Sequence, residues 1–399
     1  MDRTKICVMG LGYIGLPTAA LLANKGFEVE GVDINKSIVE TINEGNIHIV
    51  EPGLDKYVKK AVINKKLHAS LQPSIADIFI IAVPTPFHEG FKPNIDYIIE
   101  ATKAIAPFVR ENNIVILEST SPVGTTEKVG QTLQAEGIDI SEIFIAHCPE
   151  RVLPGNIMNE LVENDRIVGG INKQSTIEAI KFYEKFVNGE IFSTDSKTAE
   201  MAKLTENSFR DVNIAFANEL SILCDNLNID VNELIRLANR HPRVDILNPG
   251  PGVGGHCIAV DPWFIINKDP ENARIIKTAR EINLYKTEWV IEKIDNEAQK
   301  LERKNRKKPK IACFGLAFKP DIDDLRGSPA MHVARTLKSY GYEILAVEPN
   351  IDYHDDFEIF HHDKAINNAD LIIILVAHKE FKGLNIETNF DFCGLLDVF

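Results

Sequence analysis

The sequence has no apolar run long enough to span a bilayer, and its opening residues lack the apolar stretch and cleavage site of a signal peptide. These absences argue against a membrane-spanning segment and against secretion. The six cysteines are scattered and include no CxxC pair, which argues against a disulfide framework and a zinc site. We therefore expect reduced thiols, no metal and a cytoplasmic protein.

Positive charge is also scarce. The chain has 44 lysines and arginines against 58 aspartates and glutamates, a formal net charge of -14. A nucleic-acid binder needs a basic footprint, so this balance argues against that class. An anionic ligand must then be held by local donors. At 399 residues, the chain is long enough for two or three domains.

The first half alternates short β-rich runs with helical patterns. Strands are expected at KICVMG, EVEGVD, DIFIIAV, NIVILEST and IFIAHCP, and a helix is expected from Tyr13 to Lys25. Continuous apolar strands with helices between them predict a parallel, doubly wound sheet that is covered on both faces.

A helical region follows. Residues 196–225 contain no glycine or proline, and roughly thirty helical residues span about 45 Å, enough for a spine between two domains. A second long helix is expected over 272–300, and the basic run at 299–310 is interpreted as a solvated linker. The strand–turn–helix pattern then restarts, with Ser328 as a helix N-cap and Pro329 at the first helical position.

These patterns predict an α/β protein with two Rossmann-like, doubly wound domains joined by a central helical domain with a long spine helix. The expected boundaries are 1–195 for the first domain, 196–300 for the helical domain and 301–399 for the third. The helical domain would carry a glycine-rich loop with a cysteine, described below.

The clearest motif is GLGYIG, whose Gly10, Gly12 and Gly15 follow an expected strand and open an expected helix. In a dinucleotide-binding turn, such glycines permit the tight bend, the approach of a pyrophosphate and close helix–strand packing. Asp33 closes the next strand, where an acid accepts hydrogen bonds from ribose hydroxyls. An acid repels a 2′-phosphate, so Asp33 favours NAD over NADP, with Lys36 nearby as the opposing signal.

Two more segments, VPTP at 83–86 and ESTSPVGTTE at 118–127, follow later strands of the expected sheet. Both would lie on its carboxyl edge. Loops on that edge line the cofactor crevice in open α/β folds, so we expect both segments to border the dinucleotide.

One cysteine stands in an unusual loop, PGPGVGGHCIAVDPWF at 249–264. A lone cysteine such as Cys257 is ordinarily a small buried hydrophobe. Here the neighbouring glycines expose backbone N–H groups suited to a phosphate or an oxyanion, and Asp261 lies four residues on. Lys203 and Asn207 share one face of the long helix, where they either point to solvent or offer a cation and an amide to one substrate oxygen.

Together these segments resemble the UDP-glucose/GDP-mannose dehydrogenase family over nearly the full chain. The motifs GLGYIGLP, VPTP, STSPVGTT, PER, AEMAKLTENSFR, GPGVGGHCIAVDP and GLAFKPDIDDLRGSP occur in the family's order. The resemblance implies an NAD-binding first domain, a UDP-binding third domain and a homodimer built on the long helix. It also implies a four-electron oxidation of a sugar C6 hydroxyl with two NAD.

In the mechanism that the resemblance implies, Cys257 attacks the aldehyde formed by the first oxidation, and the second oxidation leaves a thioester that water hydrolyses. Oxidising an aldehyde by hydride transfer requires a tetrahedral adduct, and sulfur both adds and leaves readily. Water or Asp261 would take the hydroxyl proton. Lys203 and Asn207 would stabilise oxyanions. Thr120 and Glu150 would position water or assist proton transfer.

The resemblance also implies two sets of binding residues. The cofactor set is Gly10, Gly12, Tyr13, Ile14, Gly15, Asp33, Pro84, Thr85, Thr120 and Arg326. The substrate set is Arg151, Val152, Lys203, Asn207, Arg210, His241, Arg243, Gly254, Phe314 and Lys319. Simple solvent exposure is the competing interpretation for His241, Arg243, Lys319 and Arg326.

Two segments resemble the branch of the family that oxidises UDP-N-acetyl-D-mannosamine. They are HCPERVLPGNIMNELVENDRIVGG at 147–170 and NRHPRVDILNPGPGVGGHCIAVDPWF at 239–264. The UDP-glucose branch has a glutamate at the position of Pro154 and a lysine at the position of Val260. We therefore expect oxidation of UDP-N-acetyl-D-mannosamine to its uronate, for surface polysaccharide or glycan synthesis. UDP-N-acetylglucosamine and UDP-glucose are the alternative substrates.

Two other classes of protein also fit part of this sequence. A two-electron hydroxyacid dehydrogenase of the 3-hydroxyisobutyrate or 6-phosphogluconate type would share the glycines, the lysine and the asparagine, but not the cysteine loop or the third domain. A non-catalytic nucleotide-sugar or NAD sensor would use the same scaffold. The NADH released per sugar tests the first alternative, and any turnover excludes the second.

Overall fold

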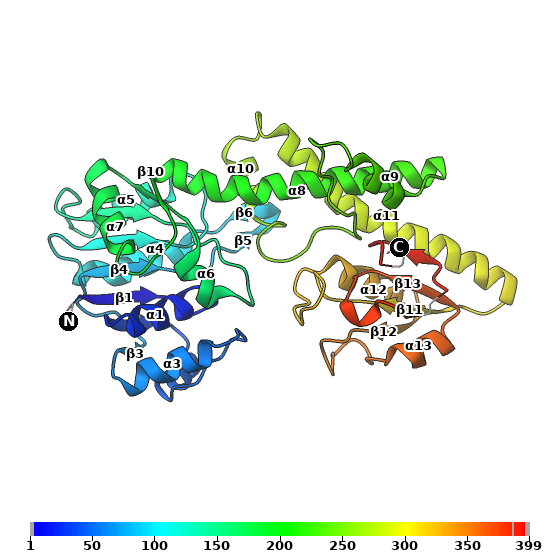
Figure 1. Cartoon of the computed structure of the whole chain (residues 1–399), viewed down its shortest axis with the longest axis horizontal. Coiled ribbons are helices and arrows are strands. Elements are labelled where there is room, and N and C mark those ends of the chain that lie inside the picture. The colour runs from blue at the N-terminus through cyan, green and yellow to red at the C-terminus, as the bar shows by residue number, and fades with distance from the viewer. Residues whose placement is uncertain (1–3, 385–386, 396–399) are drawn as a thin grey trace. The chain divides into compact units, whose positions relative to one another are not determined.

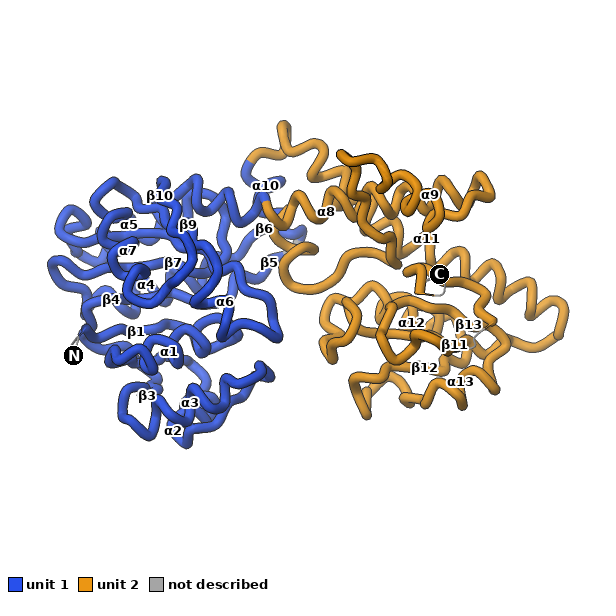
Figure 2. The backbone as a smooth tube through the Cα atoms, in the orientation of Figure 1, with its two compact units in different colours: residues 1–205, 263–268 blue, residues 206–262, 269–399 orange. Residues whose placement is uncertain are grey.

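The computed structural model describes residues 4–384 and 387–395. The chain forms two compact units, shown in separate colours in Figure 2. The first comprises Met1–Thr205 and Trp263–Lys268, and the second Glu206–Pro262 and Asp269–Phe399. Within the described part of the chain, no helix combines the length and the apolar content needed to cross a membrane.

The first unit is built on an eight-stranded sheet in the order β10-β9-β8-β7-β4-β1-β2-β3 (Figure 1). Its strands are β1 Lys5–Met9, β2 Glu28–Val32, β3 Leu67–Ser70, β4 Ile78–Ile81, β7 Ile114–Leu117, β8 Phe144–His147, β9 Arg166–Gly170 and β10 Ile191–Asp195. Neighbouring strands are parallel except β8 and β9. The expected parallel sheet is therefore present, but β9 and β10 extend it in the opposite direction, which the apolar runs did not indicate.

Helices pack on both faces of this sheet. They are α1 Gly15–Asn24, α2 Lys36–Asn43, α3 Leu54–Ile63, α4 Asp96–Ile105, α5 Thr125–Ala135, α6 Ile157–Glu163 and α7 Lys173–Tyr183, and a small ribbon pairs β5 Phe87–His88 with β6 Lys92–Pro93. Along β1, Ile6 and Val8 join one buried cluster, while Cys7 and Met9 join the other. This alternation explains why the strand is apolar on both sides.

The predicted spine helix is confirmed as α8, Ser196–Leu227. The other helices of the central region are α9 Val231–Ala238, α10 Asp261–Lys268 and α11 Arg274–Asn305. Helix α11 runs further than expected, so the linker interpretation of 299–310 is wrong for its first half. Arg303 and Lys304 occupy the last turn of α11, where cations interact favourably with the helix dipole.

The second unit carries a four-stranded parallel sheet in the order β12-β11-β13-β14. Its elements are β11 Lys310–Phe314, α12 Pro329–Ser339, β12 Glu343–Val347, α13 His362–Asn368, β13 Leu371–Ile374 and β14 Phe390–Asp391. Ser328 caps α12 by accepting the Met331 N–H at 3.2 Å, with Pro329 at the first helical position, as predicted. The fold class expected from the sequence is confirmed.

Candidate active site

The turn between β1 and α1 has the geometry that its glycines require. Gly10 has φ of 90° and donates its N–H to the Val32 carbonyl at 2.8 Å. A Cβ on Gly15 would lie 1.8 Å from the Gly10 oxygen, because the helix starts directly against the turn. A Cβ on Gly12 would meet no described atom within 4 Å, so this position is open to a ligand.

The start of α1 and Asp33 complete this turn. No side chain of the described residues caps the N-terminus of α1, which leaves that end of the helix suited to an anion. The Asp33 carboxylate accepts the Leu11 N–H at 3.0 Å and the Asn35 N–H at 2.9 Å, and the residue is only half-buried. Tyr13 is exposed and Ile14 partly exposed on the same turn. These residues fit a dinucleotide: Gly12 would let a pyrophosphate approach the backbone, and Asp33 would accept hydrogen bonds from a ribose.

The loops after β4 and β7 lie side by side at the carboxyl edge of the sheet. The Thr85 hydroxyl donates to the Thr120 carbonyl at 2.7 Å, and the Ser119 hydroxyl donates to the Val83 carbonyl at 2.7 Å. Pro84 is exposed between them. The structure therefore brings together the residues that VPTP and ESTSPVGTTE contribute to the expected cofactor edge.

Glu150 follows β8, but its carboxylate is buried and already partnered. It forms an ion pair with Arg166 at 2.7 Å and accepts the Arg151 N–H at 2.7 Å. The Arg151 guanidinium donates to the Asp165 carbonyl at 3.3 Å, and Val152 packs against the core of the unit. Sequence reasoning missed Arg166, because nothing in its local sequence shows that β9 folds back beside β8.

Helix α8 carries the predicted Lys203, which is half-buried, and Arg210, which is exposed. One turn before Lys203, the buried Glu200 carboxylate accepts the Gly124 N–H at 2.5 Å and the Thr126 N–H at 2.7 Å. Glu200 therefore caps the start of α5 and fixes this part of α8 against the loop that follows β7.

In the second unit, the cysteine loop gathers three of the predicted catalytic residues. Cys257 is exposed, and its carbonyl accepts the Asp261 N–H at 2.8 Å, so the segment turns helically as the spacing suggested. Asp261 is buried at the start of α10, and its carboxylate accepts a hydrogen bond from the Asn207 amide at 2.5 Å. Asn207 is thereby held beside the cysteine loop.

Two glycines of this loop lie too close to neighbouring atoms to carry a side chain. A Cβ on Gly254 would lie 2.5 Å from the Gly327 oxygen, and one on Gly255 would lie 2.8 Å from the Phe318 ring. The segment after β11 therefore packs directly onto the cysteine loop. An ion pair between His256 and Asp324 at 3.1 Å joins the same two segments.

The remaining predicted residues of the second unit lie before the cysteine loop, in β11 and in the segment after β11. Arg326 is exposed and binds the Asp324 carboxylate at 2.9 and 2.8 Å, which lowers the pKa of that carboxyl. His241 and Arg243 are exposed, and Lys319 is half-buried. Phe314 is wholly buried, with its ring centroid 5.1 Å from that of Phe381, so its side chain has no surface to offer a substrate.

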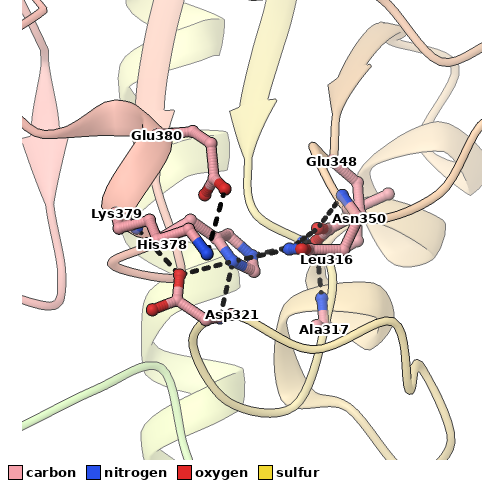
Figure 3. A network of polar contacts seen from close by, with 8 residues as sticks. All are labelled: Leu316, Ala317, Asp321, Glu348, Asn350, His378, Lys379 and Glu380. Atoms are coloured by element: carbon pink, nitrogen blue, oxygen red, sulfur yellow. Dashed lines mark hydrogen bonds and ion pairs between the residues drawn. The ribbon is translucent and has the colours of Figure 1, made fainter. Parts of the chain in front are cut away.

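Sequence reasoning also missed a second acid, Glu348, which follows β12 as Asp33 follows β2. Its carboxylate accepts the N–H groups of Leu316 and Ala317 at 2.8 and 3.0 Å, and it pairs with His378 at 3.1 Å (Figure 3). The signal was present in the sequence, since YEILAVE repeats the pattern of a strand that ends in an acid.

Three family models match the chain in succession. The NAD-binding domain of the UDP-glucose/GDP-mannose dehydrogenase family matches residues 4–187, its central domain 197–285 and its UDP-binding domain 312–394. The chain therefore belongs to the UDP-glucose/GDP-mannose dehydrogenase family, and it is an NAD-dependent UDP-sugar dehydrogenase. The cofactor is NAD, and the turn after β1 lies within the matched NAD-binding domain.

Its relatives have more specific names. The UDP-N-acetyl-D-mannosamine dehydrogenase of Campylobacter jejuni is 55% identical over 407 residues, covering 98% of this chain and 99% of the relative. The NDP-N-acetyl-D-galactosaminuronic acid dehydrogenase of Ralstonia nicotianae is 51% identical over 399 residues, covering 96% and 93%. A solved UDP-N-acetyl-mannosamine dehydrogenase from S. aureus superposes with a TM-score of 0.87 at 41% identity, covering 99% and 100%.

Proposed function

We propose that this chain oxidises the C6 hydroxyl of UDP-N-acetyl-D-mannosamine to the carboxylate, using two NAD and a covalent intermediate on Cys257. The names of the Campylobacter jejuni and S. aureus relatives support this substrate, as do Pro154 and Val260, the two departures from the UDP-glucose branch. The observation that carries the mechanism is the exposed Cys257 one helical turn before Asp261, whose carboxylate holds Asn207.

Bound NAD would accept one hydride in each of the two oxidations. Asp261, or a water beside it, takes the proton of the C6 hydroxyl as the aldehyde forms. The Cys257 thiolate then adds to the aldehyde carbon, and the Lys203 ammonium and Asn207 amide stabilise the oxyanion.

The second oxidation leaves the sugar carbon bound to Cys257 as a thioester. Water, positioned by Thr120 and Glu150, adds to this carbon. The C–S bond breaks, which returns the thiol and releases the uronate.

We assign the exposed apolar face of α8 to a second copy of the chain. Phe209, Phe216, Leu223 and Leu227 are 70%, 51%, 50% and 66% exposed. Their spacings of seven, seven and four residues place them along one helical face. A contiguous apolar stripe of this kind marks an interaction surface, and a homodimer in the cytoplasm is the arrangement that we propose.

A substrate panel tests the assignment. Purified protein is supplied with UDP-N-acetylmannosamine, UDP-N-acetylglucosamine, UDP-N-acetylgalactosamine or UDP-glucose, each with NAD or NADP. We expect UDP-N-acetylmannosamine with NAD to give the highest kcat/KM and two NADH per sugar. If another sugar gave a higher kcat/KM, that sugar would be assigned as the substrate. One NADH per sugar would show a two-electron oxidation in place of the proposed four-electron oxidation.

The Cys257→Ser variant tests the covalent step. Serine is a much weaker nucleophile toward the aldehyde, so we expect at most one NADH per sugar and no uronate by mass spectrometry. NAD binding should be unchanged, because Cys257 lies outside the turn after β1. The matched control is Cys393→Ser, a half-buried cysteine whose thiol contacts the Asp391 carboxylate. Uronate formation by Cys257→Ser at the normal rate would disprove the covalent mechanism.

A further inference from the structure

The first unit contains a buried group of ionisable side chains, of which the proposed mechanism uses only one, Glu150, the most exposed of the four. Glu118 follows β7, Glu150 follows β8, Arg166 begins β9 and Tyr183 ends α7. Their exposed fractions are 2%, 7%, 3% and 0%. Water therefore solvates these groups poorly, and their charges must be balanced by one another.

The four side chains form one connected chain of contacts. Arg166 Nη1 donates to Glu150 Oε2 at 2.7 Å, and the Arg166 guanidinium carbon lies 5.5 Å from the centre of the Tyr183 ring. The Tyr183 hydroxyl donates to Glu118 Oε1 at 2.7 Å. Glu118 Oε2 is buried with no hydrogen-bond partner among the described residues.

The charges of this group do not balance when both carboxyl groups are ionised. Two carboxylates then face a single guanidinium, and an uncompensated buried charge is costly. One proton removes the excess. Its natural position is Glu118, because Glu150 already has the direct ion pair with Arg166.

The electrostatics of Glu118 agree with this count. Burial, followed by the negative charge of Glu150, raises the pKa of Glu118 to about 7. The other ionisable groups beside it contribute no further charge at neutral pH. Burial raises the pKa of the Cys148 thiol to about 12 and also raises that of the Tyr183 hydroxyl, so both stay protonated.

We propose that Glu118 is a positioning residue for the oxidation, and that the state of its proton decides how firmly Arg166 holds the Glu150 carboxylate. The inference rests on the role given to Glu150 in the proposed function. With Glu118 protonated, Arg166 interacts with a single carboxylate, and Glu150 is held tightly. When Glu118 ionises, a second negative charge shares the guanidinium, and Glu150 becomes a better acceptor for a proton from water.

The pH dependence of kcat tests this inference, from about pH 5 to about pH 9, with whichever nucleotide sugar the protein turns over. The intact protein should show kcat rising through an ionisation near pH 7, where Glu118 titrates. Glu118→Gln keeps the shape and stays neutral, so it should lose this rise and fall about tenfold below the intact protein at high pH. Glu118→Gln with the same profile as the intact protein would overturn the inference.

Tyr183→Phe is the matched variant, because it keeps the carboxyl group and removes the hydrogen bond to it. That bond lowers the pKa of Glu118, so its loss should move the rise of kcat to higher pH. An unshifted profile in Tyr183→Phe counts against the inference. A merely structural Glu118 would lower the unfolding temperature in both variants and leave both profiles in place. Absence of any turnover by the intact protein would instead refute the proposed function.

A second measurement needs no turnover. In infrared spectra of the free protein, a protonated carboxylic acid gives a C=O stretch that disappears as the acid ionises. A band that titrates near neutral pH should be present in the intact protein and absent in Glu118→Gln. Glu111→Gln, which removes an exposed carboxylate, should retain the band. The same band in Glu118→Gln would show that another group holds the proton, and would overturn the inference.

Discussion

The turn after β1 and the turn after β11 begin with the same backbone geometry. Gly10 and Gly315 have φ of 90° and 88°, and each donates its N–H to the last carbonyl of the next strand in the chain at 2.8 Å. In each turn an acid follows that strand and accepts the N–H of the residue after the glycine. The acid is Asp33 in the first turn, at 3.0 Å, and Glu348 in the second, at 2.8 Å.

The two acids differ in what surrounds them. Asp33 is half-buried beside an open position at Gly12. Glu348 is 2% exposed, and its two oxygens accept from two backbone N–H groups, from the wholly buried His378 and from Asn350 (Figure 3). A glycine turn with a following acid therefore makes a ribose site only where the acid keeps acceptor capacity for a ligand. In the second turn, that capacity is used within the protein.

The largest effect expected from this comparison is on stability. Glu348→Ala leaves the buried N–H groups of Leu316 and Ala317 without an acceptor, so the free energy of unfolding should fall by about 3 kcal/mol. Urea denaturation measures this change. The KM for NAD should not change, because we expect NAD to bind at the turn after β1. An increased KM for NAD with normal stability would show that the two turns have the same role.

The sequence predicts the first turn well because its signals are local. The glycines, the strand and Asp33 lie within one βαβ unit, and each of these requirements appears in adjacent sequence. The difference between the turns is not local. His378 reaches Glu348 from 30 residues further along the chain, and no spacing rule reveals that contact.

In the candidate active site, too, local contacts could be predicted from the sequence and long-range contacts could not. The contact of Asp261 with Cys257 could be anticipated, because the two residues follow helical spacing within one motif. The contact of Asp261 with Asn207 could not, because the two residues lie in separate motifs. The ion pair between Glu150 and Arg166 could not, because it depends on β9 running antiparallel to β8. The burial of Phe314 could have been anticipated, because β11 belongs to a sheet expected to be covered on both faces.

The second expected effect is on cofactor affinity. Asp33→Ala removes the acceptor that we expect the ribose hydroxyls to use. Hydrogen bonds to a charged group contribute about 1.5–3 kcal/mol, so the KM for NAD should rise about 10- to 100-fold. Steady-state kinetics with varied NAD measure it. Urea denaturation of the free protein should show a loss of about 1 kcal/mol or less, since the residue is half-buried. A large stability loss with an unchanged KM would mean that Asp33, like Glu348, serves the fold alone.

The smallest effect separates the two turns by their response to acid. Burial acts to raise the pKa of Glu348, but hydrogen bonds from His378 and from the Leu316 and Ala317 N–H groups outweigh it, and the net pKa is lowered. A lowered pKa means that Glu348 contributes stability above its unfolded value of about 4.3, and that this contribution is lost as pH falls through the folded value.

Glu348→Gln keeps the shape but cannot titrate, so its unfolding free energy should fall less steeply below about pH 4 than that of the intact protein. At neutral pH the variant should be less stable by about 1 kcal/mol, because an amide accepts hydrogen bonds more weakly than a carboxylate. Denaturation at several pH values measures both differences, and the exposed Glu358→Gln gives the baseline for removing one charge. Parallel curves for the intact protein and Glu348→Gln would mean that His378 and the turn do not hold Glu348 as an anion. The second turn would then be as free to bind a ligand as the first.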